Sequence, residues 1–286
     1  MSKIYDCFTY NNEELILKLR LETLHQIVDT FVIAESPFTH TGRPKPLHFQ
    51  LSRFEKFRSK IVHLIVDDIP LEPENFMLNE NYQRNALLRG LKMASPEDQI
   101  IISDVDEIPS PDAIRRYHPW FLYGTFMQRF YCYYLNNFAV QKHDPVRPRW
   151  WIRAKITTMK HLTEFFQTPQ NLRLYKTGPG IGGQLKYLHR KLRHQRLSDG
   201  GWHFSWIMTP QGMIDKIESV YETQFDLPHI KNTETIKSAI ASELDILGKG
   251  ERFRLVNLDA HFPQYLVNNF DQFRSYYCPP NTLSKE

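Results

Sequence analysis

The sequence predicts an α/β protein with a mostly parallel central sheet flanked by helices, followed by a C-terminal part of mixed structure. Over the first hundred residues, short apolar segments rich in β-branched residues alternate with segments of helical periodicity. That alternation indicates parallel strands joined by crossover helices. The three isoleucines at 100–102 are not interrupted by polar residues, which is typical of a strand buried on both faces of its sheet.

The strands and helices of the first hundred residues can be predicted in order. Strands are expected over Ile4–Thr9, Thr30–Ala34, Lys60–Val66 and from Gln99 into the acidic residues that follow. Asn11 and Glu14 match a capping box with Asn11 as the helix cap. The apolar stripe of this first helix is Leu17, Leu21, Leu24 and Val28. Two further helical segments are expected over Leu51–Phe57 and Asn79–Ala94.

Beyond residue 110 the pattern is less regular. We expect an aromatic strand over Phe126–Leu135 and helices over Asp112–Tyr117, Pro210–Tyr221 and Thr233–Leu247. GPGIGG, which begins at Gly178, is predicted to be a flexible loop. It leads into a basic cluster that is either a solvated face or a patch for an anionic ligand: Lys186, Arg190, Lys191, Arg193 and Arg196.

The composition limits the possible classes of protein. Hydrophobic residues make up 41% and charged residues 24%, which is an ordinary globular balance. A net charge of +4 is too small to indicate nucleic-acid binding. The three cysteines lie far apart, so neither a disulfide framework nor a zinc cluster is indicated. The chain shows no signal region and no transmembrane segment, so we expect a soluble protein of the cytoplasm.

Three carboxylates follow the predicted buried strand, within four residues: Asp104, Asp106 and Glu107. Parallel strands present their functional groups at their carboxyl ends. Carboxylates this close repel one another, and a hard cation such as Mg²⁺ or Mn²⁺ relieves that repulsion. If the segment is extended, Asp104 and Asp106 point the same way. A solvated acidic turn is the alternative. The chain has no glycine-rich phosphate loop, so a bound diphosphate would need a metal and basic side chains.

Six stretches occur together and in a characteristic order: IYDCF, FVIAES, FTHTGRPKPL, YQRNAL, DVDEIP and GGWHFSW. In this set the sequence resembles glycosyltransferase family 17, from about Ile4 to Asp226. The resemblance implies a GT-A-like (Rossmann-like) fold over residues 1–226. From the residue pattern we expect a helical extension over 227–286 packed on that domain, with a mobile tail beyond Tyr277. It also implies a metal-binding DxD motif, here Asp104-Val105-Asp106. The implied cofactor is Mn²⁺ or Mg²⁺, and the implied donor is UDP-GlcNAc.

The same resemblance implies that the sugar passes from the UDP-sugar to a glycan acceptor with inversion, which gives a β-linkage. Asp106 is then expected to bind the metal directly, and Asp104 to contact the ribose or a metal-bound water. Glu107 is expected to orient the turn or to act as the base. His203 is a candidate for a further metal ligand, and a histidine packed between aromatic side chains is the alternative. Other candidates for the base are Asp144, Asp199, Asp215 and Glu222.

Three further residues are candidates for donor binding. Arg84 and Lys45 could reach the phosphates or the GlcNAc, or form surface ion pairs instead. Glu35, at a strand end, could accept a hydrogen bond from the uracil imide, or cap a helix.

Two other functions stay open. Members of the family carry a His and a Glu in the helix after GGWHFSW, where this chain has Glu222 and Gln224. The chain could therefore be a nucleotide-sugar or glycan-binding protein without catalysis. A phosphatase with an aspartate nucleophile also begins with a buried strand and DxD, but such motifs are usually followed by a small pair of residues, not by Glu107-Ile108.

Overall fold

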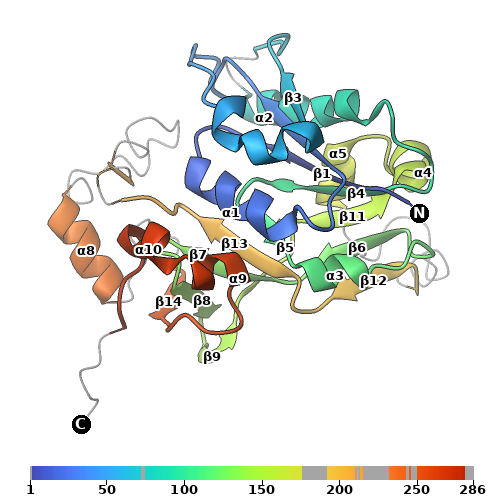
Figure 1. Ribbon diagram of the computed structural model, residues 1–286. Coiled ribbons are helices and arrows are strands. Elements are labelled where there is room, and N and C mark those ends of the chain that lie inside the picture. The colour runs from blue at the N-terminus through green and yellow to red at the C-terminus, as the bar shows by residue number, and fades with distance from the viewer. Residues whose placement is uncertain are drawn as a thin grey trace. The chain divides into compact units, whose positions relative to one another are not determined.

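A computed structural model of the chain describes residues 2–71, 75–175, 192–209, 211, 213–214, 232–242, 245 and 250–280 (Figure 1). The fold divides into two compact units. The first comprises residues 1–128 and 152–201, and the second comprises residues 129–151 and 202–286. In the second unit, β14 (Arg252–Leu255) pairs with β8 (Asn137–Gln141) in one sheet. The domain boundary at residue 226 stays a prediction.

The first unit is built on a sheet that has seven strands among the described residues. Its order is β12-β6-β11-β4-β1-β2-β3. The strands are β1 (Ile4–Thr9), β2 (Thr30–Glu35), β3 (Ile61–Ile65), β4 (Gln99–Asp104), β6 (Tyr123–Phe126), β11 (Lys155–Thr158) and β12 (His194–Leu197). β1, β2, β3 and β4 pair in parallel, and β11 is antiparallel to both of its neighbours. The predicted mostly parallel α/β sheet is thus confirmed.

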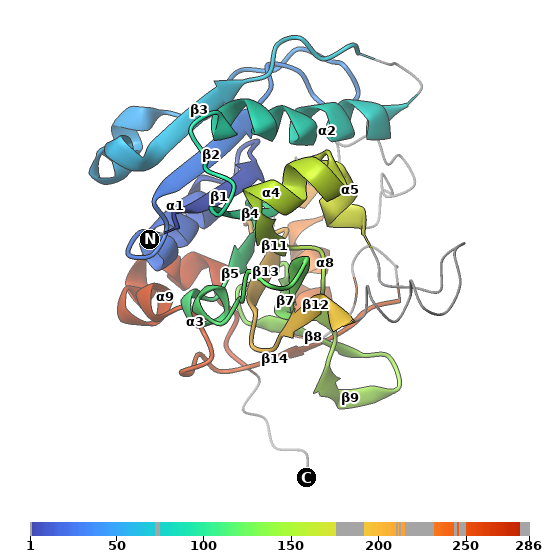
Figure 2. The same ribbon diagram turned by 90° about the vertical axis from the view of Figure 1, so that its right-hand side faces the viewer.

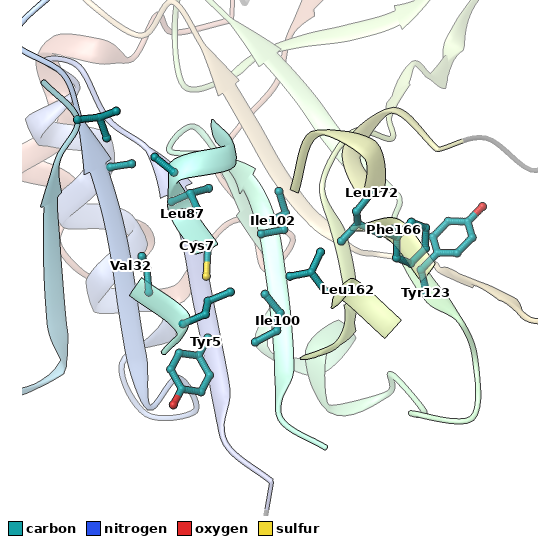
Figure 3. Close-up of a cluster of buried hydrophobic side chains, with 14 of the residues drawn as sticks. Tyr5, Cys7, Val32, Leu87, Ile100, Ile102, Tyr123, Leu162, Phe166 and Leu172 are labelled. Carbon is teal, nitrogen blue, oxygen red and sulfur yellow. The ribbon is translucent and has the colours of Figure 1, made fainter. Parts of the chain in front are cut away.

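Helices cover both faces of this sheet (Figures 1 and 2). They are α1 (Glu14–Leu24), η1 (Leu51–Lys60), α2 (Phe76–Asn85), η2 (Ala86–Leu91), α3 (Pro111–Arg115), α4 (Met159–His161), η3 (Leu162–Phe166) and α5 (Pro169–Leu174). On one face, Cys7, Ile100 and Ile102 pack against Leu87 and Leu172 in a buried cluster (Figure 3). Burial of each such apolar side chain stabilises the folded state by about 2 kcal/mol. Because side chains alternate along a strand, the intervening residues of these strands point to the opposite face of the sheet, where α1 lies.

Several helices and strands differ from the prediction in their caps or bounds. Asn11 is not the helix cap, because α1 begins after Glu13, whose carboxylate accepts the backbone N–H groups of residues 11 and 12. The helix expected over Asn79–Ala94 consists of α2 and the 3₁₀ helix η2. The strand expected over Phe126–Leu135 is instead two strands, β6 and β7 (Gln128–Cys132), which belong to different sheets. α8 (Thr233–Ala241) is shorter than expected.

Some predictions fall on residues that are not described. These are the loop from Gly178, most of the helix expected over Pro210–Tyr221, the end of the tail, and the candidates Lys186, Arg190, Lys191, Asp215, Glu222 and Gln224. In the described part of the chain, no helix is long and apolar enough to cross a bilayer.

The second unit holds a smaller sheet in which β14, β8, β7 and β13 (Gly201–Ser205) lie in that order. β9 (Asp144–Pro148) pairs with β8, and β10 (Trp150–Trp151) pairs with β7. Helix α8 packs on it through Ile236 and Ile240, which join a buried cluster with Phe130 and Phe253. The chain then continues through α9 (Gln264–Asn268), α10 (Phe270–Phe273) and η6 (Arg274–Tyr276).

Candidate active site

The three carboxylates lie on a tight turn at the carboxyl end of β4. β4 ends at Asp104, Val105 and Asp106 form the turn, and β5 (Glu107–Pro109) begins immediately afterwards. The expectation that Asp104 and Asp106 share one side of an extended segment was therefore wrong, because the backbone turns between them. The turn also brings the Glu107 side chain back, so that its Oε2 accepts the Asp104 N–H at 3.0 Å.

Arg20, on α1, holds this turn from inside the protein. The side chain is fully buried, and its guanidinium forms a fork with both oxygens of Asp6 at 2.6 and 2.7 Å. A further N–H donates to the Ser103 hydroxyl at 2.6 Å. Nη1 donates to three backbone carbonyls of the turn, those of Asp104, Val105 and Glu107. Because one side chain binds three carbonyls, the path of the turn is fixed by the chain itself.

Two other arginines hold the carboxylates of the turn. Arg84, on α2, donates to Asp104 at 2.9 Å and to Gln170 at 2.6 Å. Arg173, on α5, donates to Asp104 at 2.5 Å and to both oxygens of Glu107 at 2.5 and 2.8 Å. Burial alone would lower the pKa of the Arg173 guanidinium, but Asp104 and Glu107 raise it above its ordinary value.

The surroundings of Asp104, Asp106 and Glu107 bear on the roles that were predicted for them. Asp104 is 31% exposed at the edge of the site, whereas Glu107 is fully buried. The contacts of Glu107 with Arg173 and with the Asp104 N–H favour the orienting role, and the base role stays a prediction. Asp106 is half-buried on the turn, and its charge also raises the pKa of Arg173.

The oxygen donors of the turn fit Mg²⁺ or Mn²⁺ by their chemistry. In the described residues, no three or more His, Cys, Asp or Glu side chains are grouped closely enough to hold a metal by themselves. Mg²⁺, however, is commonly bound by one or two carboxylates together with substrate phosphates and waters. The residues present therefore fit a metal that arrives with a diphosphate.

Glu35 and Lys45 lie at the end of β2 and in the loop that follows it. The Glu35 carboxylate is buried and accepts from the backbone N–H of His48 at 2.5 Å, from that of Phe49 at 3.2 Å and from His63 Nε2 at 3.1 Å. Lys45 Nζ lies 3.9 Å from Glu35. Burial lowers the pKa of the Lys45 ammonium, and Glu35 offsets only part of that effect. Contacts of both residues with a donor stay predictions.

Glu35→Gln should destabilise the protein by about 1–3 kcal/mol at pH 7, because buried charge-assisted hydrogen bonds are lost. Although burial raises the pKa of Glu35, the hydrogen bonds from His63, His48 and Phe49 lower it below its usual value overall. The stability from this shift is present above the unfolded-state pKa of about 4.3 and is lost as the pH falls through the folded-state value.

Urea unfolding at pH 7, 5 and 3.5 measures this effect. The difference between wild type and Glu35→Gln should shrink toward the lowest pH. Glu55→Gln is the control, because Glu55 is exposed and its ion pair with Arg58 lies on the surface. A difference that stays constant over this pH range would contradict the assignment.

His203, on β13, belongs to the second unit. Its ring is buried and stacks between Phe130 and Trp151, with centroid distances of 4.9 and 4.2 Å. These contacts match the packed-histidine alternative, and the role as metal ligand stays a prediction.

Sequence reasoning missed Asp6, Arg20 and Arg173. Asp6 and Arg20 did leave a signal. Asp6 interrupts an apolar strand, and Arg20 lies three residues after Leu17 and four before Leu24, on the apolar stripe of its helix. Opposite charges on a buried strand and on the buried face of the next helix indicate an internal ion pair. Arg173 left no such signal, since it lies on a six-residue helix and reaches a partner 66 residues away.

These observations define an α/β protein that carries a preformed acidic turn at the carboxyl edge of its parallel strands, where such sheets bind nucleotides. The chain belongs to glycosyltransferase family 17, whose model matches residues 1–168. This confirms the resemblance drawn from the six sequence stretches.

Among its relatives are the β-1,4-mannosyl-glycoprotein 4-β-N-acetylglucosaminyltransferases of Rattus norvegicus and Mus musculus, each 26% identical over 95% of this chain and 54% of theirs. The human protein of that name is 25% identical over the same shares. The chain thus spans about half the length of the curated relatives it matches. A solved structure of glucosyl-3-phosphoglycerate synthase from Mycobacterium tuberculosis, in complex with Mn²⁺, UDP and phosphoglyceric acid, matches at a TM-score of 0.32 with 14% identity, covering 93% of this chain and 91% of that one.

Proposed function

We propose that the chain is a metal-dependent, inverting glycosyltransferase that moves a sugar from a UDP-sugar to a glycan acceptor in β-linkage. Membership of glycosyltransferase family 17 supports sugar transfer. The names of the relatives favour GlcNAc as the sugar and UDP-GlcNAc as the donor. The observation that carries the proposal is the acidic turn. Arg20 donates hydrogen bonds to three of its backbone carbonyls, and the turn lies at the carboxyl edge of the parallel strands, where α/β sheets bind nucleotides.

The side chains of the turn have distinct roles in this proposal. Asp106 binds the cation, and Asp104 contacts the ribose or a metal-bound water. When bound, Mn²⁺ or Mg²⁺ would supply the positive charge that neutralises the diphosphate and makes UDP a better leaving group. Arg84 and Lys45 are the candidates for contacts with the phosphates or the sugar.

Asp106→Asn should weaken metal-dependent binding of UDP-GlcNAc by at least about tenfold, because a neutral amide is a poorer ligand for a hard cation than a carboxylate. Isothermal titration calorimetry with Mn²⁺, and with EDTA in its place, measures this in wild type and variant. Asp112→Asn is the matched control, since Asp112 is exposed on α3 and its ion pair is with Arg115 of the same helix.

The outcomes separate the possible functions. Metal-dependent binding together with release of UDP in the presence of glycan acceptors supports the transferase. Binding without release over a broad acceptor panel supports a nucleotide-sugar-binding protein. No binding of UDP or of any UDP-sugar by the folded wild type contradicts both. Hydrolysis of a phosphomonoester would support the phosphatase, although the ion pairs of Asp104 with Arg84 and Arg173 disfavour it as a nucleophile.

A further inference from the structure

The two oxygens of Asp104 are held separately by two arginines. Oδ1 accepts from Arg84 Nη2 at 2.9 Å, and Oδ2 accepts from Arg173 Nη2 at 2.5 Å. The arginines come from α2 and α5, which lie side by side (Figure 2) and are linked by the bond from Arg84 to Gln170. The carboxylate therefore cannot rotate toward another ligand unless one of these contacts breaks.

Arg173 connects Asp104 to Glu107. Its Nη2 also donates to Glu107 Oε1 at 2.8 Å, and its Nη1 donates to Glu107 Oε2 at 2.5 Å. Such a planar fork on a buried carboxylate is among the strongest hydrogen-bonded pairs in proteins. Both guanidiniums are almost fully buried, with 2% of the Arg84 side chain and 8% of the Arg173 side chain exposed.

These ion pairs change the charge that a metal ion would meet. The two positive charges of Arg84 and Arg173 offset most of the negative charge of the carboxylates that they bind, which are Asp104, Glu107 and, through Arg84 Nη2 at 2.6 Å, Glu80. The turn as a whole therefore attracts a divalent cation much less than three unpaired carboxylates would. This fits the finding that the described residues contain no group of three or more acidic, His or Cys side chains able to hold a metal.

We infer that Arg173, together with Arg84, is a positioning residue that keeps Asp104 and Glu107 from binding the metal directly. The divalent cation then binds only together with the diphosphate of the donor. The diphosphate supplies ligand oxygens in place of those of Asp104 and Glu107, which are bound to the two arginines. This inference rests on the proposed function for the identity of the diphosphate. It makes the arginines, and not the acidic residues alone, responsible for the order in which metal and donor bind.

A purely structural role for Arg173 makes a different prediction. If the arginine only stabilises the fold, its loss should weaken the binding of Mn²⁺ and of UDP together. If it withholds Asp104 and Glu107 from the metal, its loss should tighten the binding of Mn²⁺ alone and weaken the binding of UDP in the presence of Mn²⁺. The two effects have opposite signs only in the second case.

Mn²⁺ binding measured by electron paramagnetic resonance in the absence of nucleotide, and UDP binding measured by calorimetry at saturating Mn²⁺, test this. For Arg173→Met we expect Mn²⁺ alone to bind about tenfold more tightly, the effect of removing one neighbouring cation. UDP should bind at least about tenfold more weakly, because the turn is no longer held in one orientation. Arg173→Lys keeps the charge but lacks the fork, so only UDP binding should weaken.

Two further variants complete the test. Arg84→Met removes the contact to Asp104 Oδ1, together with those to Gln170 and Glu80, and leaves the pair of Arg173 with Glu107 intact, so it serves if Arg173→Met does not fold. Arg115→Met, on an exposed surface pair, should change neither measurement. Unchanged Mn²⁺ binding in folded Arg173→Met and Arg84→Met, or a parallel loss of both ligands, would overturn the inference. Failure of wild type to bind UDP with any metal would instead overturn the proposed function, and Mn²⁺ binding without nucleotide would still report on the arginines.

Discussion

Arg20→Met should lower the free energy of unfolding by about 3–5 kcal/mol, which is the usual cost of removing one partner from a buried ion pair. The variant leaves the Asp6 carboxylate fully buried without the fork that neutralises it. It also removes the donor shared by the carbonyls of Asp104, Val105 and Glu107. Stacking of the Arg20 guanidinium on Phe8, 4.3 Å from the ring centroid, is lost as well.

Urea denaturation of wild type, Arg20→Met, Asp6→Asn and the double variant measures this cost and its origin. The double variant should be less destabilised than the sum of the two single variants, because neither charge is then left alone. Arg115→Met is the matched control and should change stability by no more than about 0.5 kcal/mol, since its pair with Asp112 is exposed. A loss below about 1 kcal/mol for Arg20→Met would contradict the role of this pair in the fold.

Gly201→Ala should destabilise the protein by about 3 kcal/mol or more, and two separate effects contribute. The backbone φ of Gly201 is +117°, which side chains of L-residues rarely adopt. An added Cβ would also lie 2.1 Å from the Ile108 carbonyl oxygen and 2.6 Å from the Ser110 nitrogen. These are backbone atoms of β5 and the residue after it, so no side chain can move aside to relieve the overlap.

Gly42→Ala separates the two effects. Gly42 also has a positive φ, +81°, but the nearest atom to an added Cβ is a Leu71 side-chain carbon at 3.8 Å. This variant should therefore show only the conformational cost, about 1 kcal/mol. Equal losses in the two glycine variants, measured by urea denaturation, would contradict the close approach at β5. Because Ile108 follows Glu107 directly, Gly201→Ala should also weaken metal-dependent UDP binding.

The four parallel strands β1 to β4 were predicted from the sequence nearly residue by residue, because buried parallel strands are short, apolar and β-branched, whereas β11 and β12 of the same sheet were not predicted. β1 was predicted with its bounds, and β2 to within one residue. Hydrophobic patterning could not show that the chain passes from one sheet to the other between Phe126 and Gln128, because aromatic residues stand on both sides of that point. The cap of α1 was missed because Glu13, and not Glu14, accepts the backbone N–H of Asn11, together with that of Asn12.

The candidate site was predicted in its residue types but not in its arrangement. The acidic residues and their place at a strand end follow from local sequence. Their directions depend on Arg20, Arg84 and Arg173, which lie 84, 20 and 69 residues from Asp104 along the chain. Arg20 left a partial signal through its place on the apolar stripe of α1, but contacts between residues so far apart in the chain do not show in local sequence patterns.

The position of Arg173 in the chain has a consequence for synthesis on the ribosome. β1, β2, β3, β4 and Arg20 are all available once residue 109 has emerged, so the turn can take its path early. The partner that neutralises Glu107 is made 66 residues later. At translation rates of about 5–20 residues per second, roughly 3 to 13 seconds separate the two events. During that interval a nascent chain holds a carboxylate without its counter-charge, so the acidic edge cannot close until Arg173 has been made.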